Sequence, residues 1–339
     1  MKPREVDNPP NPWASHHVEW LGEVPTTELK VYEEEARTIL SENQSPDLPF
    51  RYGLNPYRGC FHGCIYCYAR PSHQYLDWGA GSDFERRIVV KTNAAKLLEE
   101  GLKSERWKPD TIVFSGVTDC YQPLEASYEL TRRCLEACAE RRNPVGIVTK
   151  GALICRDIDI LSEMATWNGV RVFLSIPFAS DEMGKKIEPF ATTISQRFRA
   201  VERLAKAGVD VGVSLAPMVP GLNDEMIPTI LEEAAKRGAR RAFLTVLRLP
   251  SPVDEIFEGA LREALPERAD RVLSAIRDLR GGDLSEHRFG ERMVGKGPRW
   301  IAIRQLFHGT CQRVGLLTSR DKGLNRNAFR RFGQQELEI

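Results

Sequence analysis

Short apolar runs rich in β-branched residues alternate along the middle of the chain with longer amphipathic stretches. Such runs are typical of strands buried on both faces, and the stretches between them repeat apolar residues at helical spacing. The predicted strands cover residues 51–54, 111–115, 145–149, 170–176, 209–215 and 242–247. A strand followed by a helix, repeated along the chain, predicts a parallel sheet built from βα units.

The helices predicted between these strands are recognised by an apolar face and, in two cases, by a glycine just past their ends. Gly208 and Gly238 follow two of them, and glycine readily forms a left-handed cap there. The predicted helices cover residues 124–141, 159–167, 195–206 and 224–237. Their regular spacing supports a repeated βα architecture.

Parallel strands must be joined by right-handed crossovers, and six βα units close most simply into a barrel or a part of one. We therefore predict an α/β fold with a partial (β/α)6 TIM-type barrel over residues 49–250. Residues 1–48, Pro-rich and then acidic, form a predicted N-terminal arm laid over the barrel. Residues 251–339 form a predicted C-terminal helical and basic extension with one clear helix at 266–279.

The composition, with 42% hydrophobic and 28% charged residues among 339, is that of a globular protein and excludes global disorder. No run of about 18 apolar residues occurs, and prolines and histidines occupy the first positions, where a secretory signal would be apolar. Eight cysteines are too few for a disulfide-stabilised secreted fold. We therefore predict a cytoplasmic protein with no membrane partner.

Three of the eight cysteines are interpreted as core residues. Cys134 and Cys138 share one helical face with Leu130 and Leu135. A second metal site there is disfavoured because no further His or Cys lies nearby in sequence. Cys311 is also better explained as a core residue than as a thiol facing a substrate.

Positive charge is concentrated near the C-terminus. Residues 287–333 contain eleven Lys and Arg against two acids, a formal charge of +9, whereas the whole chain carries +1. Aromatic residues alternate with these basic ones, and cations for phosphates combined with rings for stacking are typical of nucleic-acid-binding surfaces. DNA or RNA is therefore a predicted partner. The alternative is a helical cap whose aromatic residues pack on the barrel while its arginines stay hydrated.

The most specific motif is a C-x3-C-x2-C triplet directly after the first predicted strand. Its members are Cys60, Cys64 and Cys67. Three thiolates this close can bind three corners of an iron–sulfur cubane, and Gly59 and Gly63 let the backbone fold tightly around it. The alternative is a zinc site with His62 or His73 as an unusually spaced fourth ligand. A position after a barrel strand favours the cubane, because catalytic residues of such barrels come from carboxyl strand ends.

This triplet, with the aromatic Tyr66 before its last cysteine, resembles the signature of the radical S-adenosylmethionine (SAM) superfamily. The resemblance implies a 4Fe-4S cluster with one open iron that chelates SAM and cleaves it reductively to a 5′-deoxyadenosyl radical. It also implies an electron donor such as flavodoxin or ferredoxin. The strand-end runs 114–123, 148–150 and 174–177, followed by 188–189 and 216–217, are similar to the branch of spore photoproduct lyase and DNA-repair-photolyase-like bacterial proteins.

The same resemblance implies a set of SAM-binding residues at the strand ends. They are Tyr66, Tyr68, Gly116, Thr118, Asp119, Lys150 and Ser175. The turn at 116–119 would meet the methionyl amino group, Lys150 the carboxylate and Ser175 a ribose hydroxyl, with the two tyrosines beside the adenine. Each has a structural alternative: Lys150 and Ser175 as hydrated loop residues, and Asp119 as a cap of the following helix.

One position departs from this branch. Spore photoproduct lyase has a hydrogen-donating cysteine in the turn after the second strand, and Val117 stands at the matching position here. This difference puts lesion reversal itself in doubt. Cys120, three residues later, is the candidate hydrogen donor or substrate contact.

The sequence thus predicts a radical SAM enzyme that acts on DNA or another nucleic acid in a photolyase-like repair or modification reaction. Two alternatives remain open. One is radical SAM modification of a peptide or small molecule, and the other is a zinc-stabilised nucleic-acid-binding protein without radical chemistry.

Overall fold

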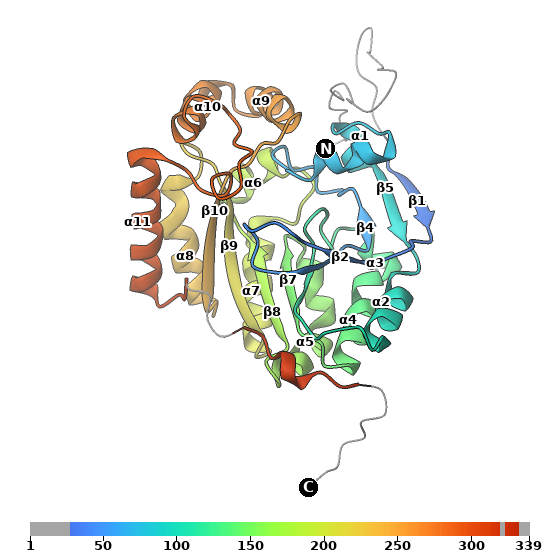
Figure 1. The fold of residues 1–339 in the computed structure, drawn as a ribbon. Helices are drawn as coiled ribbons and strands as arrows, with labels where there is room; N and C mark the ends of the chain where they lie inside the picture. The colour runs from blue at the N-terminus through green and yellow to red at the C-terminus, as the bar shows by residue number, and fades with distance from the viewer. Residues whose placement is uncertain (1–27, 319–322, 332–339) are drawn as a thin grey trace.

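The computed structural model describes residues 28–318 and 323–331, and its centre is a seven-stranded sheet (Figure 1). The strand order is β10-β9-β8-β7-β6-β3-β2, and every neighbouring pair is parallel except β2 with β3. The parallel strands are β3 (Tyr52–Leu54), β6 (Ile112–Phe114), β7 (Val145–Thr149), β8 (Val170–Ser175), β9 (Asp210–Met218) and β10 (Arg241–Val246). These are the six strands that the apolar runs predict.

Helices follow the strands as the βα pattern predicts. They are α2 (Ala94–Lys103), α4 (Leu130–Glu140), α5 (Ile158–Ala165), α7 (Ile194–Lys206) and α8 (Ile227–Lys236). The α7 helix begins with a capping box, in which Thr193 and Gln196 satisfy each other's backbone N–H groups. The sheet is open, with β2 and β10 at its edges, so the prediction of an α/β fold with a partial barrel is confirmed.

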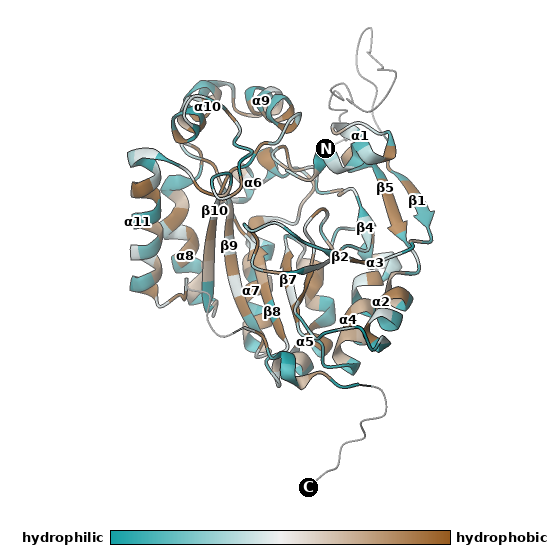
Figure 2. Cartoon of the chain, viewed as in Figure 1, coloured by the Kyte–Doolittle hydropathy of each residue, from teal (hydrophilic) through white to brown (hydrophobic). Residues whose placement is uncertain are grey.

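The predicted arm contributes strands as well as covering the core. Its strand β2 (Leu40–Glu42) pairs antiparallel with β3, and β1 (Lys30–Glu34) pairs parallel with β5 (Arg87–Lys91). The short β4 (Tyr57–Arg58) completes this second sheet, in the order β1-β5-β4. In Figure 2, β5 is hydrophobic and β1 hydrophilic, as expected when β5 is central and β1 is an exposed edge.

The chain after β10 forms more helix than the sequence predicts. The predicted helix is α10 (Pro266–Arg280), and α9 (Val253–Ala264) and α11 (Gly297–Val314) are additional. Figure 1 shows α9 and α10 at one end of the sheet, α11 beside α8, and the short η4 turn (Arg326–Ala328) at the opposite end. The extension therefore runs along the whole molecule. The domain boundaries near residues 48 and 250 stay predictions.

Short elements complete the described chain. They are η1 (Arg70–Leu76), α1 (Ser82–Arg86), α3 (Glu125–Tyr128), η2 (Ala152–Asp157), α6 (Asp181–Ile187) and η3 (Asp224–Met226). None of the helices in the described segments is both long and apolar enough to cross a bilayer. All eight cysteines are free thiols. Cys134, Cys138 and Cys311 are buried in the core, which confirms their interpretation as core residues.

Close packing at one glycine links the end of β7 to the turn after β6. A Cβ atom at Gly151 would lie 2.4 Å from the Tyr121 carbonyl oxygen. We expect Gly151→Ala to lower the free energy of unfolding by about 1–3 kcal/mol, because backbone must shift to relieve the overlap. Urea unfolding measures the change.

Gly259→Ala is the matched control, since a Cβ atom there meets nothing within 4 Å and the residue lies inside α9. It should leave stability unchanged or raise it by up to about 1 kcal/mol through helix propensity. Equal stability of Gly151→Ala and the wild type would show that this contact does not constrain the two strand ends.

Candidate functional site

The three cysteines lie in one loop that follows β3 and β4, here called the cysteine loop (residues 59–68). Cys60 and Cys64 are buried and Cys67 is partly buried. The buried Arg70 anchors the loop by donating to the Cys64 carbonyl oxygen at 3.0 and 3.2 Å, and it forms an ion pair with Glu85 at 2.6 Å. Residues 68–91, an insertion between β4 and the α2 helix, therefore support the loop.

Glycine is required at two points of the cysteine loop. Gly59 and Gly63 have φ values of +80° and +64°, in the left-handed region that favours glycine. A Cβ atom at Gly59 would lie 2.7 Å from the Phe84 carbonyl oxygen, and one at Gly63 would lie 2.9 Å from Cδ2 of Phe190. The loop can thus reach this conformation only with glycine at both positions.

The turn after β6 holds the other side of the cysteine loop. The Thr118 hydroxyl donates to the Gly59 carbonyl oxygen, and Gln122 accepts from the Phe61 N–H at 3.0 Å. The turn begins with Ser115 at a φ of +80°, which is unusual for a residue with a side chain. Such a conformation persists only where its surroundings enforce it and is common at functional sites.

Asp119 joins the ends of three segments. Its carboxylate accepts from the Thr149 hydroxyl at 2.6 Å and from the Lys150 N–H at 2.8 Å, and it lies 3.5 Å from Nδ1 of His62. The α3 helix has no side-chain cap, so the alternative in which Asp119 caps that helix is wrong. Instead, the residue fastens the β6 turn to the end of β7 and to the cysteine loop.

A buried network connects Tyr66 to Lys150. The Tyr66 hydroxyl donates to Oε1 of Glu188, and the Lys150 ammonium lies 3.9 Å from the same oxygen and 5.7 Å from the Tyr66 ring centroid. The other Glu188 oxygen pairs with Arg197 at 2.5 Å. Glu188 and Arg197 are fully buried, so each charge depends on its partner.

Burial sets the protonation states around the cysteine loop. It raises the pKa of Cys60 well above its usual range and that of Cys64 to about 12, so both are neutral thiols at neutral pH when no metal is bound. It lowers the pKa of His62 to about 4, which makes that ring neutral. Burial also acts to lower the pKa of Lys150, but the Cys64 thiolate that forms at high pH and the Glu188 carboxylate outweigh it and raise the pKa, so Lys150 stays charged at neutral pH.

The remaining predicted SAM-binding residues lie at the same edge of the sheet. The Tyr68 side chain is about half exposed, and its hydroxyl donates to the Gly116 carbonyl oxygen at 2.6 Å. Ser175 is buried at the end of β8, where its hydroxyl donates to the Ala216 carbonyl oxygen at 3.1 Å. The fold thus brings the whole predicted set to the carboxyl ends of β6, β7 and β8. Their roles toward SAM stay predictions.

Cys120 lies inside the core rather than on the surface. It has no exposed area, its N–H donates to the Ser115 hydroxyl at 3.2 Å, and its carbonyl oxygen accepts from Thr131 at 2.6 Å. Val117, in the same turn, is exposed. The sulfur packs beneath the turn, and its role as hydrogen donor or substrate contact stays a prediction.

Two members of the site, Glu188 and Arg197, are absent from the sequence-predicted set. Arg197 occupies the buried face of α7 together with Ile194, Phe198 and Val201. A charged residue at a core position of an amphipathic helix is the sequence signal for it, because an arginine there needs a buried partner. Glu188, in the irregular segment after α6, belongs to one of the runs that carry the resemblance to the family, but the sequence assigns it no role.

The histidines considered for zinc have other partners. Nε2 of His73 lies 2.8 Å from the Arg87 carbonyl oxygen, and its ring packs against Phe84 and Trp78. In the described segments, no three His, Cys, Asp or Glu side chains converge on the position of a single metal ion, the cysteine triplet included. A cubane cluster does not require this, because each cysteine binds a different iron.

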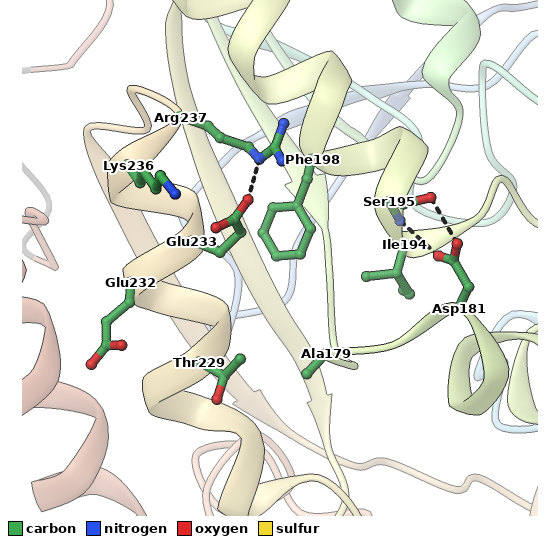
Figure 3. A pocket seen from close by; sticks show the side chains of 10 residues that line it. All are labelled: Ala179, Asp181, Ile194, Ser195, Phe198, Thr229, Glu232, Glu233, Lys236 and Arg237. Atoms are coloured by element: carbon green, nitrogen blue, oxygen red, sulfur yellow. Dashed lines mark hydrogen bonds and ion pairs between the residues drawn. The ribbon is translucent and has the colours of Figure 1, made fainter.

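A separate groove of about 640 Å³ lies between α7 and α8 (Figure 3). Two of its acids are already paired: Glu233 binds Arg237 at 2.5 Å, and Asp181 accepts from Ser195 at 2.7 Å. Its lining residues are Ala179, Asp181, Ile194, Ser195, Phe198, Thr229, Glu232, Glu233, Lys236 and Arg237. None of the predicted site residues lines this groove.

The basic residues of 287–333 do not form one continuous surface. Many of them pair with carboxylates of the rest of the chain or of their own segment. These pairs neutralise much of the segment's positive charge. The pairs are Arg288–Glu286, Arg292–Asp47, Lys296–Glu291, Arg299–Asp224, Arg313–Glu232 and Arg326–Asp110. Arg320, Lys322 and Phe332 lie outside the described residues. Trp300 and Phe307 are buried, as the helical-cap alternative expects, whereas Phe289 is exposed.

A family model described as the radical SAM superfamily matches residues 54–234, from the end of β3 into α8. The chain belongs to the radical SAM superfamily. An uncharacterized protein of Mycobacterium tuberculosis is 36% identical over 232 residues, which are 68% of each chain. Another, of Methanocaldococcus jannaschii, is 31% identical over 174 residues, which are 51% of this chain and 62% of that one.

Solved structures of spore photoproduct lyase share this radical SAM fold. The enzyme complexed with dinucleoside spore photoproduct matches with a TM-score of 0.61 and 15% identity, over 85% of this chain and 81% of that one. A mutant with bound AdoMet and dinucleoside spore photoproduct gives a TM-score of 0.58. The resemblance read from the cysteine triplet is thereby confirmed. The protein is an enzyme whose family implies SAM and an iron–sulfur cluster.

The Glu188–Arg197 pair should dominate the stability of this radical SAM core. We expect Arg197→Met to lower the free energy of unfolding by about 3–5 kcal/mol. The substitution leaves the buried Glu188 carboxylate with the more distant Lys150 as its remaining cation. Denaturant unfolding is the measurement.

Arg237→Met tests a half-exposed ion pair on α8 and should cost less than about 1 kcal/mol. A double variant, Glu188→Gln with Arg197→Met, should recover part of the loss, because no unpaired carboxylate remains in the core. The recovery should be incomplete, because Lys150 loses the acid beside it. Similar losses for Arg197→Met and Arg237→Met would refute the importance of the buried pair.

Proposed function

We propose that the protein is a radical SAM enzyme in which Cys60, Cys64 and Cys67 hold a 4Fe-4S cluster. The donor set supports this, because three free thiols share one loop and none of them serves as a disulfide. When bound, such a cluster supplies the electron that cleaves SAM reductively to a 5′-deoxyadenosyl radical. The chain's own part is to fix the loop and to bind and shield the reacting groups.

The observation that carries this proposal is the convergence of the cysteine loop with the ends of β6 and β7. Asp119 accepts hydrogen bonds from residues at the end of β7 and lies 3.5 Å from His62 of the loop. This arrangement brings the Lys150 ammonium beside the loop, where burial and its lasting charge suit it to a carboxylate such as that of a methionyl group. The Ser175 hydroxyl, at the next strand end, donates to the Ala216 carbonyl oxygen and keeps its own oxygen as an acceptor for a ribose hydroxyl.

Each of the three cysteines should be necessary for the cluster. Anaerobic reconstitution of Cys60→Ser, Cys64→Ser or Cys67→Ser should remove most of the iron, sulfide and 420-nm-region absorbance that the wild type acquires, because a cubane needs all three protein ligands. Dithionite-reduced wild type should form 5′-deoxyadenosine from SAM, and the variants should not.

Cys134→Ala is the matched control, since this cysteine is buried in α4 among core residues. It should retain iron, sulfide and 5′-deoxyadenosine formation. One zinc ion per chain in place of iron and sulfide, after anaerobic purification, would contradict the proposal and favour the zinc-stabilised alternative.

We further propose a nucleic-acid substrate, modified or repaired in a photolyase-like reaction. The fold shared with spore photoproduct lyase is one support. The other is the pairing of exposed rings with cations near the sheet edge: Arg292 lies 4.2 Å from the Phe289 ring centroid, and Arg248 lies 5.7 Å from that of Tyr68. Rings and cations together suit bases and phosphates. A flavodoxin or ferredoxin is the proposed electron donor.

A nucleic-acid substrate should accelerate the reaction and bind in a salt-dependent way. We expect oligonucleotides, but not peptides of matched length, to raise the rate of 5′-deoxyadenosine formation by the reduced holoenzyme. Their affinity should fall as salt rises, because phosphate contacts release counterions. Stimulation by peptides alone, or affinity that is independent of salt, would exclude this substrate class.

A further inference from the structure

Arg248 is a cation at the edge of the proposed active site that the sequence gives no reason to single out. It lies two residues past the end of β10, and its side chain is half-buried. Its guanidinium lies 5.7 Å from the ring centroid of Tyr68, the residue directly after Cys67. Arg248 therefore borders the cysteine loop from the last strand of the sheet.

The guanidinium of Arg248 forms no ion pair in the described part of the chain, and the acid that acts on its charge, Asp47, is already bound by Arg292. No hydrogen bond or ion pair joins it to residues 28–318 or 323–331, whereas most arginines of these segments bind a carboxylate or a carbonyl oxygen. Contact with the Tyr68 ring compensates the burial only in part, because a cation–π contact is worth about 0.5–2 kcal/mol. A partly desolvated cation without an anion is suited to bind one.

A second arginine adds positive charge at the same place. Burial, and then the nearby Arg292, lower the pKa of Arg248. Arg292 itself is neutralised by Asp47, with Nε 2.6 Å from Oδ2, and the other oxygen of Asp47 accepts from the Gly290 N–H at 2.7 Å. The Asp47 carboxylate is thus already bound by Arg292 and Gly290. A single negative charge therefore faces the two positive charges of Arg248 and Arg292.

The segment that carries Arg292 is held firmly over the end of β10. Arg280 donates to the carbonyl oxygens of Leu247, Arg292 and Val294, at 2.5, 3.0 and 2.9 Å. Figure 1 shows the chain after α10 crossing near this end of β10. The two arginines therefore belong to a supported part of the fold, which favours a site that exists before any ligand binds.

The cation proposed for the SAM carboxylate is a different one. Lys150 follows β7, which is three strands away from β10, or about 14 Å at the backbone for strands about 4.8 Å apart. Lys150 faces Glu188 and Tyr66, whereas Arg248 faces Tyr68 and Arg292. The two cations can accordingly serve two different anions.

We propose that Arg248, supported by Arg292, binds a phosphodiester group of the substrate. A guanidinium can donate two parallel hydrogen bonds to a phosphate, and Tyr68 beside it offers a ring for an adjacent base. This inference rests on the proposed nucleic-acid substrate and names the residue that anchors it.

Binding of a fluorescently labelled short thymidylate oligonucleotide at several salt concentrations tests the proposal, with reconstituted wild type and three variants. Arg248→Gln should weaken binding about tenfold and reduce the slope of log Kd against log salt by about 0.7–1, because one phosphate contact is lost. Arg248→Lys should keep the slope while losing affinity. The control Arg304→Gln removes one charge from the exposed face of α11 and should leave both unchanged.

Thermal unfolding separates a binding role from a structural one. Because Arg248 loses no hydrogen bond or ion pair, only its contact with the Tyr68 ring, Arg248→Gln should lower the unfolding temperature by no more than a few degrees. Wild-type affinity and slope in Arg248→Gln, or equal effects of Arg304→Gln, would overturn the assignment of Arg248 while a nucleic-acid substrate stands. If wild-type protein binds no oligonucleotide, both the assignment and the proposed substrate fail.

Discussion

The fixed conformation of the cysteine loop is the constraint on which the rest of the site depends. The loop has no helix or strand of its own and must present three sulfurs from eight consecutive residues, so neighbouring segments have to supply its rigidity. Arg70 binds it from the insertion, Thr118 from the β6 turn, and the Ile187 carbonyl oxygen from the end of α6 accepts from Ile65. These supports come from positions that only the folded sheet brings together, so the conformation of the cysteine loop depends on the folding of the sheet.

A second constraint follows from the burial of Glu188. A carboxylate without solvent has to be surrounded by donors and cations, and Tyr66, Lys150 and Arg197 provide them from the loop, the end of β7 and α7. The same group that stabilises the core therefore orients the aromatic residue of the triplet. It also holds the Lys150 ammonium within reach of the cysteine loop. Stability and the geometry of the proposed SAM site share these atoms.

Sequence patterns predict the parts of this fold whose local signal agrees with their final environment. The strand at 145–149 and the helix that ends before Gly208 are found as predicted, because buried strands are apolar and glycine caps helices. The pairing of β1 with β5 and of β2 with β3 could not be predicted, since β1 and β2 are short, polar edge strands. The partners of Asp119 and Arg197 come from distant segments, and a single sequence carries no record of such contacts. Of the residues in the candidate site, only the three cysteines could be predicted from their spacing, because all three lie in one loop.

The net charge of a surface likewise depends on tertiary ion pairs that the sequence of one segment does not show. In the sequence, residues 287–333 read as one basic segment, but in the fold most of its described cations meet acids, such as Asp47, Asp224 and Glu232. What matters for recognition is therefore the cation that the fold leaves outside any ion pair, not the number of cations in a segment. Arg248 is such a cation, and it lies outside the basic segment. A guanidinium that forms no ion pair, beside a ring of the cysteine loop, is a more specific attraction for a phosphate than a helix of neutralised arginines.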